Sequence, residues 1–156
     1  MFPRPLSSVQ DFLITMNNKL FGLNKVIIYT DGGARGNPGL AAMAVIVNGK
    51  KYGEYIGKAT NNEAEYRAVI LGLTKARQML GKTKAREAEI EVRMDSELIE
   101  RQLNGEYRVK EENLKGLYVD AHNLCFEFKK VIFTHVPREK NREADRLVNE
   151  VLNSQK

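Results

Sequence analysis

Apolar residues recur in short runs from residue 25 onward, and the first three runs have the composition of β-strands. Residues 25–29 are rich in β-branched side chains, and a second apolar run follows at 40–47. Asn48 and Gly49, a dipeptide that favours tight hairpin turns, separate this run from a third one at 52–56. The pattern therefore predicts three antiparallel strands that follow one another along the chain.

Beyond these strands, the spacing of apolar residues predicts four helices and two further strands. Helical spacing is expected over residues 62–80, 96–103, 111–128 and 141–152, and strand alternation over 89–94 and 131–136. Gly81, followed by Lys82 and Thr83, is the expected end of the first helix, and Asn141 is the expected cap of the last. The order βββαβααβα is typical of an α/β fold in which a mixed sheet carries helices on both faces.

Residues 1–24 differ from the rest of the chain, and we expect them to form an amino-terminal extension to a domain over 25–156. Ser8 and Asp11 have the spacing of a helix capping box. Apolar residues then recur at helical spacing: Val9, Phe12, Leu13, Met16 and Leu20. This spacing predicts that the extension forms a short amphipathic helix, which docks on the domain or on a partner.

Composition and charge narrow the possible partners. The 156 residues suit one domain, and 25 Lys and Arg against 20 Asp and Glu give a formal net charge of +5, which favours a polyanionic partner. Cys125 is the only cysteine, so no intramolecular disulfide forms, and the longest apolar run, 40–47, is too short to span a bilayer. We expect a cytoplasmic monomer without a membrane partner.

Four carboxylates stand at positions where an unpaired acid is unfavourable. Asp31 and Asp95 follow predicted strands, whereas Glu65 and Asp145 lie in the first turns of predicted helices, in line with their apolar faces. Such acids lose hydration energy unless a cation shares the site, and oxygen-only ligands suit Mg²⁺ or Mn²⁺. Two such ions about 4 Å apart promote in-line phosphodiester hydrolysis. Taken singly, each acid also fits a turn or a helix-dipole role.

The segments around these acids resemble a known family. TDGGARGNPG, TNNEAE, MDSE and NREAD occur in the order and approximate spacing of ribonuclease H type 1, over roughly residues 25–153. The resemblance implies a ribonuclease H-like fold with a five-stranded mixed sheet. It also implies that Asp31, Glu65, Asp95 and Asp145 bind two Mg²⁺ or Mn²⁺ ions. The implied reaction cuts the RNA strand of RNA/DNA hybrids to leave 5′-phosphate and 3′-hydroxyl ends, and duplex RNA is a further candidate substrate.

Two short polar segments are candidates for substrate binding. The glycine-rich segment 32–39 lets a ligand approach the backbone, and contact with ribose 2′-hydroxyls would distinguish RNA from DNA. In the family, positions matching 60–62 help to hold the nucleic acid. The candidates are therefore Gly32, Gly33, Asn37, Thr60, Asn61 and Asn62. The alternatives are a tight connection between strands for the glycines and a helix cap for residues 60–62.

His135 and Arg138 are both candidates for the residue that assists catalysis. The family usually has a histidine in a loop ahead of its last catalytic aspartate, and His135 matches that spacing when counted back from Asn141. The segment HVPREKN also fits a shortened loop in which His135 belongs to the strand and Arg138 lies near the site. We favour Arg138, through contact with substrate phosphate or departing product.

The chain also departs from the better-known bacterial members of the family. Those members carry a long, basic, Trp-containing insertion, whereas residues 104–110 occupy that region here and the chain has no Trp. Two other functions remain open at this point. One is a non-catalytic nucleic-acid-binding module, and the other is a DNA-directed nuclease of the same superfamily.

Overall fold

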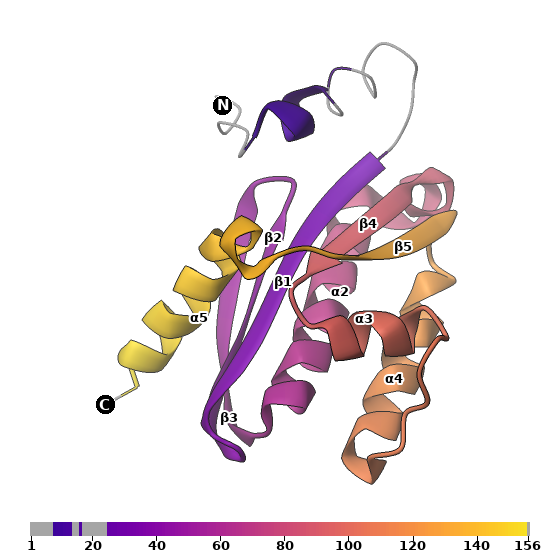
Figure 1. Ribbon diagram of the computed structural model, residues 1–156. Helices are drawn as coiled ribbons and strands as arrows, with labels where there is room; N and C mark the ends of the chain where they lie inside the picture. The colour runs from indigo at the N-terminus through magenta and orange to yellow at the C-terminus, as the bar shows by residue number, and fades with distance from the viewer. Residues whose placement is uncertain (1–7, 14–15, 17–24, 156) are drawn as a thin grey trace.

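A computed structural model describes residues 8–13, 16 and 25–155 of the chain (Figure 1). In this part of the chain, five strands form one mixed sheet in the order β3-β2-β1-β4-β5. The strands are β1 (Lys25–Gly36), β2 (Gly39–Val47), β3 (Lys50–Ala59), β4 (Glu89–Met94) and β5 (Lys130–His135). The first three are antiparallel neighbours, and β4 and β5 run parallel to β1. The predicted mixed sheet is confirmed.

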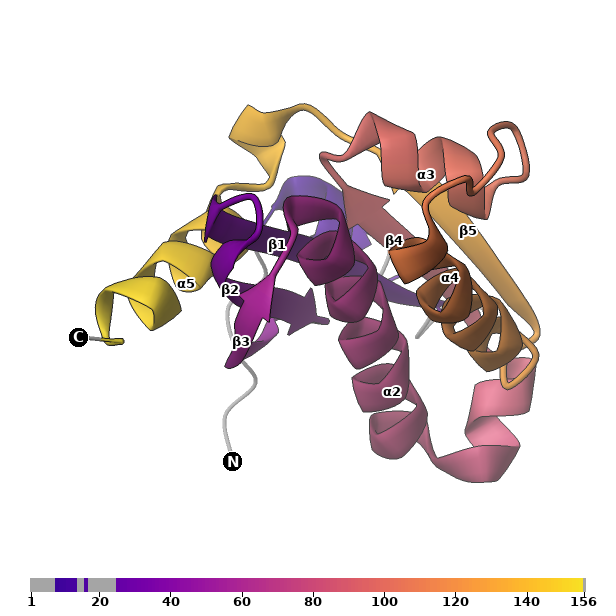
Figure 2. The ribbon, with the colours of Figure 1, turned by 90° about the horizontal axis from the view of Figure 1, so that it is seen from below.

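Helices cover both faces of this sheet, as the sequence predicts. They are α2 (Asn61–Glu87), α3 (Glu97–Leu103), α4 (Glu112–Cys125) and α5 (Arg142–Asn153), with a 3₁₀ turn, η1, at Arg138–Lys140. Figure 2 shows α2 and α4 next to each other on one face and α5 on the other. The larger core packs Tyr66 and Leu73 of α2 against Ile28 and Val92, and a smaller core packs Val148 of α5 on the sheet.

The observed element boundaries differ from the prediction at two glycine-containing segments. We expected β1 to end at Asp31, but it continues to Gly36 and stays paired with β2, so that Asp31 lies opposite Ala44. The prediction failed because glycine-rich backbone can hydrogen-bond in a ladder as well as form a turn. Gly81 has φ 78° and interrupts α2 where an end is predicted, but the helix resumes and runs to Glu87.

The described part of the amino-terminal extension is helical over residues 9–13 and contacts the sheet through a polar side chain. The Asp11 N–H donates to Ser8 Oγ at 3.1 Å, which forms one half of the predicted capping box. Asp11 is the buried residue of this segment as far as it is described. The predicted apolar stripe is exposed at Val9, Phe12, Leu13 and Met16. Leu20 lies outside the described residues.

Among the helices in the described part of the chain, each is too short or too polar to cross a bilayer.

Candidate active site

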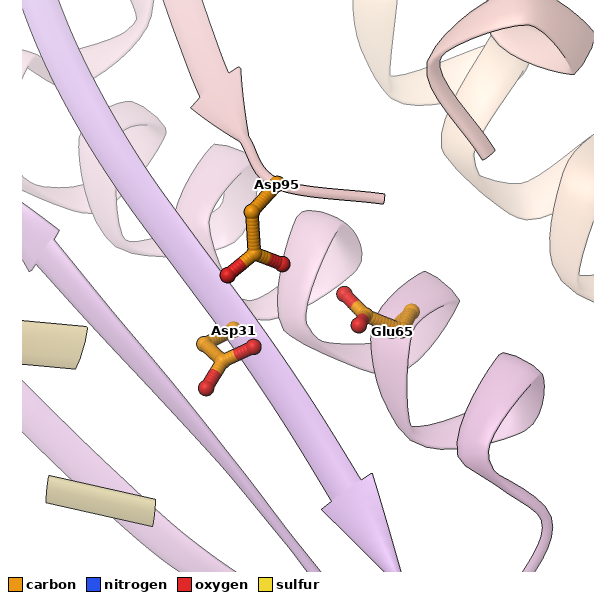
Figure 3. Close-up of side chains that lie close together, drawn as sticks. All are labelled: Asp31, Glu65 and Asp95. Carbon is orange, nitrogen blue, oxygen red and sulfur yellow. The ribbon is translucent and has the colours of Figure 1, made fainter. Parts of the chain in front are cut away.

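Three of the four predicted carboxylates meet at one end of the sheet. Asp31 lies in the middle of β1, Glu65 at the start of α2, and Asp95 directly after β4. Each offers an oxygen, and these oxygens all lie within 4.8 Å of one another. Figure 3 shows the three side chains converging from the strand, the helix and the loop. Residues that are 34 and 30 positions apart in sequence therefore form one acidic cluster, here called the carboxylate cluster.

Gly32 allows this convergence because β1 packs directly against the start of α2. A Cβ atom at Gly32 would lie 2.2 Å from the carbonyl carbon of Ala64 and 2.5 Å from the nitrogen of Glu65. No side chain fits such distances, so glycine is required for Asp31 and Glu65 to come together. The Gly32 N–H also donates hydrogen bonds to the carboxylates of Asp31 and Glu65, which lowers the pKa of each.

Other effects on the cluster outweigh that hydrogen bond. Burial, followed by the negative charges of Asp95 and Asp145, raises the pKa of Asp31 to about 8. Burial and the charges of its two neighbours in the cluster raise the pKa of Glu65 well above its usual value. The pKa of Asp95 is raised mainly by burial, against the opposing effects of Asn141 and Arg138. The cluster is therefore short of positive charge, and a bound cation would stabilise its ionised form.

Asp145 borders the same groove but stands apart from the carboxylate cluster. The groove has a volume of about 450 Å³ and is lined by the three clustered acids together with Asp145 and Arg138. Asp145 lies in the first turn of α5, on the face that carries Val148, as its spacing predicts. Its side chain is 33% exposed, and its Oδ1 lies 3.5 Å from Nη2 of Arg138. Asp145 is thus close enough to act on the same ligand.

The two candidates for the assisting residue lie in different places. His135 is the last residue of β5, opposite Met94, and it lowers the pKa of Asp95 less than Arg138 does. Arg138 lies in η1, lines the groove and is 79% exposed. Its charge lowers the pKa of each acid in the carboxylate cluster. Arg138 therefore has the closer electrostatic connection to the site.

The predicted substrate-binding residues lie at the edge of the groove and partly hold one another. Asn61 accepts a hydrogen bond from the Ala34 N–H at 2.8 Å, and its own N–H donates to Asn37 Oδ1 at 2.9 Å. Thr60 forms a full capping box with Glu63, so the cap interpretation is confirmed for Thr60. Gly33, a further candidate, lines the groove. Asn62 is the second residue of α2.

Asn141 is a site residue that the sequence analysis did not identify. We expected it to cap α5, and it occupies that position, but its side chain makes no capping hydrogen bond. Its Nδ2 donates instead to the Thr30 carbonyl at 2.8 Å, and it hydrogen-bonds Asp95. Asn141 is 1% exposed, and its Oδ1 has no partner among the described residues. The residue therefore ties the start of α5 to β1 and Asp95.

Comparisons with known proteins agree with this architecture. A family model described as reverse transcriptase-like matches residues 29–151. The bifunctional protein Rv2228c of Mycobacterium tuberculosis is 41% identical over 137 residues, which make up 83% of this chain and 36% of that protein. The chain thus spans little more than a third of that relative. Ribonuclease HI of Halobacterium salinarum is 41% identical over 134 residues, 82% of this chain and 64% of that protein.

A solved structure gives a fuller match. LC11-RNase H1, solved in complex with an RNA/DNA hybrid, superposes with a TM-score of 0.78 at 46% sequence identity. The match covers 83% of this chain and 97% of that one. By fold, sequence and coverage, the chain belongs to the ribonuclease H type 1 family.

Proposed function

We propose that this chain is a metal-dependent endonuclease that hydrolyses the RNA strand of RNA/DNA hybrids. The observation that carries the proposal is the carboxylate cluster, three acids with raised pKa values in an open groove. The relative that was solved with an RNA/DNA hybrid supports the choice of substrate. The expected products carry 5′-phosphate and 3′-hydroxyl ends.

The donor set fits hard divalent cations. Asp31, Glu65 and Asp95 offer carboxylate oxygens, and His and Cys ligands, which zinc favours, are missing from the cluster found among the described residues. These three acids and Asp145 would hold two Mg²⁺ or Mn²⁺ ions. Bound there, such ions would activate water and neutralise charge at the scissile phosphate.

The other residues of the groove bind and orient the substrate in this proposal. Arg138 contacts a substrate phosphate, since it is exposed, lines the groove and places its guanidinium beside Asp145. The amide oxygens of Asn37 and Asn61 are engaged in the protein, so their NH₂ groups serve as donors to ribose hydroxyls or bases. The side-chain hydrogen bond between Asn141 and Asp95 holds the Asp95 carboxylate in place.

A cleavage assay with three substrates tests the proposal. Labelled RNA/DNA hybrid, duplex DNA and duplex RNA are incubated with Mg²⁺ or Mn²⁺, and then with chelator. We expect cleavage of the hybrid that stops with chelator and with Asp95→Asn. Cutting of duplex DNA would favour a DNA-directed nuclease, and binding without cleavage would favour a non-catalytic module. Cleavage that survives Asp95→Asn would contradict the proposed site.

A further inference from the structure

Gln102 is a buried polar residue whose two side-chain groups connect different parts of the molecule. It lies on α3 and is 4% exposed. Its Oε1 accepts a hydrogen bond from the Tyr66 hydroxyl at 2.6 Å, and its Nε2 donates to the backbone carbonyl of Arg108 at 3.2 Å. Tyr66 follows Glu65 on α2 and is fully buried. Gln102 therefore links the helix that carries an active-site acid to the segment after α3.

That segment, residues 105–110, is the short connection that stands in place of the long basic insertion. Its backbone is fixed at its start, because the N–H groups of Glu106 and Tyr107 both donate to the Arg101 carbonyl, at 2.8 and 3.2 Å. Near the end of the segment, Val109 packs against the larger core. The Gln102 bond to Arg108 holds the backbone between these two points.

The side chains of this segment are presented to solvent. Tyr107 is 48% exposed, and the Arg101 guanidinium lies 5.3 Å from the centre of its ring. Arg101 also pairs with the acids nearest to it, Glu97 and Glu106. Among the described residues, Arg108 and Lys110 have no such acidic partner, and both are exposed. The segment thus offers an aromatic ring and two available cations.

The segment is also close enough to the active site to touch the same duplex. Asp95 lies two residues before α3, and the seven residues of this helix span roughly 10 Å. The segment begins two residues after this helix, and a helix of that length corresponds to about three steps along a nucleic-acid strand. In Figure 2, α3 extends from the end of β4 toward this segment.

We propose that Gln102 is a positioning residue for hybrid binding. By holding residues 105–110 in one conformation, it keeps Tyr107, Arg108 and Lys110 placed to contact the duplex beside the cleavage site. A segment fixed in advance loses little conformational entropy on binding, and cations and aromatic rings are the groups that hold phosphates and bases. This inference rests on the proposed function.

The first test separates binding from catalysis. Gln102→Glu keeps the acceptor for Tyr66 but loses the donor to Arg108, and Gln102→Met loses both without adding charge. We expect both variants to raise Kd for hybrid, measured in chelator, about threefold to tenfold, and to raise KM similarly. Turnover at saturating hybrid should stay near that of the parent. Gln78→Glu, an exposed site on α2, is the matched charge control.

The second test asks whether Gln102 acts through the segment. In a Tyr107→Ala/Lys110→Ala background, Gln102→Met should weaken binding by less than in the parent, because two of the three side chains that it positions are gone. Equal weakening in both backgrounds, or an unchanged Kd in the single variants, would overturn the inference. The cleavage assay with metal tests the proposed function separately, so a parent that cleaves hybrid while the Gln102 variants bind it unchanged would overturn this inference alone.

Discussion

Two groups of charged residues lie on the same two central strands, and they differ in how their charges are balanced. One is the carboxylate cluster, which includes Asp31 of β1 and Asp95 just after β4. The other lies two residues earlier on each strand and is centred on Tyr29 and Arg93, which are partners in the β1–β4 register. Side chains two residues apart along a strand point to the same face. The two groups are thus neighbours along these strands.

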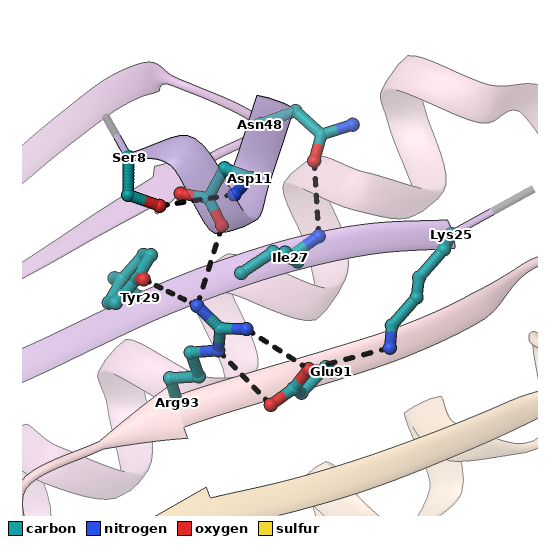
Figure 4. A network of polar contacts seen from close by, with 8 residues as sticks. All are labelled: Ser8, Asp11, Lys25, Ile27, Tyr29, Asn48, Glu91 and Arg93. Atoms are coloured by element: carbon teal, nitrogen blue, oxygen red, sulfur yellow. Dashed lines mark hydrogen bonds and ion pairs between the residues drawn. The ribbon is translucent and has the colours of Figure 1, made fainter. Parts of the chain in front are cut away.

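The second group, here called the arginine network, is well compensated. Arg93 is 14% exposed and bonds Glu91 at 3.1 Å, the Tyr29 hydroxyl at 2.5 Å and Asp11 at 3.4 Å. Lys25 adds a contact to Glu91 at 3.6 Å. Figure 4 shows these contacts. Burial alone would raise the pKa of Glu91, but the hydrogen bonds and charge of Arg93, together with smaller contributions from Thr134 and Lys25, lower that pKa.

The difference explains why the carboxylate cluster lacks positive charge. Arg93, a largely covered cation two residues before Asp95, is already engaged with Glu91 and Asp11. Its pKa is raised by Glu91 and Tyr29, although burial opposes the rise. Arg138 is largely exposed, so solvent weakens its effect. Charged groups paired within the protein stabilise the fold, whereas those left unpaired are available to bind a cation from solution.

The largest expected effect comes from removing one charge from the carboxylate cluster. Asp31→Asn should lower hydrolysis of hybrid on the order of a thousandfold, because it removes a proposed metal ligand. The same change should raise the free energy of unfolding at pH 8 in chelator by about 1–3 kcal/mol, because it relieves like-charge repulsion and burial of charge. Initial cleavage rates and urea denaturation measure the two effects.

A matched control isolates the position from the change in charge. Asp120→Asn removes an exposed acid on α4 and should alter neither quantity appreciably. If Asp31→Asn lowered stability in chelator, the cluster would have to be compensated within the protein, and the comparison with the arginine network would not hold.

The arginine network should respond in the opposite way. Arg93→Met should lower the free energy of unfolding by about 2–4 kcal/mol, because it leaves Glu91, whose side chain is 14% exposed, without its main partner. Turnover of the folded protein should stay close to that of the parent. Adding Glu91→Gln should restore part of the lost stability, since the unpaired charge is then gone. A variant that kept its stability but lost activity would place Arg93 in the active site.

The carboxylate cluster also predicts a pH dependence in the absence of metal. The pKa of Asp31 rises from 3.8 to about 8 on folding, so the folded protein keeps a proton that the unfolded chain has already lost. Raising the pH from 5 to 8 should therefore lower the free energy of unfolding, by about 3 kcal/mol from this group. Urea denaturation in chelator measures the slope. Asp31→Asn should reduce it, and an equal slope in both proteins would contradict the assignment to Asp31.

Much of the fold was predictable because local patterns and tertiary structure agree. The predicted strand over 89–94 matches β4, where alternate residues are buried. The helix predicted over 96–103 matches α3, which has Ser96 as its N-cap. The predictions failed where glycine permits more than one conformation. Whether the segment after Asp31 turns or continues as a strand depends on pairing with β2, which no local pattern encodes.

The sequence predicted the acids of the site, but not the residues that hold those acids in place. Acids placed in line with apolar faces pointed to the cluster, because burying them without compensation is unfavourable. Asn141 has the residue type and position of a helix cap, and only the folded structure shows that its side chain turns to Thr30 and Asp95. Likewise, the need for Gly32 arises from contact with Ala64, which is distant in sequence.

The smallest expected effect concerns the link between the arginine network and the amino-terminal extension. Asp11→Asn weakens a partly buried ion pair with Arg93 and should lower the free energy of unfolding by about 0.5–1 kcal/mol. In an Arg93→Met background the same change should have a smaller effect, because this ion pair is already missing. Urea denaturation of the four proteins in this cycle gives the coupling energy. Equal effects in both backgrounds would mean that Asp11 stabilises the extension through contacts other than Arg93.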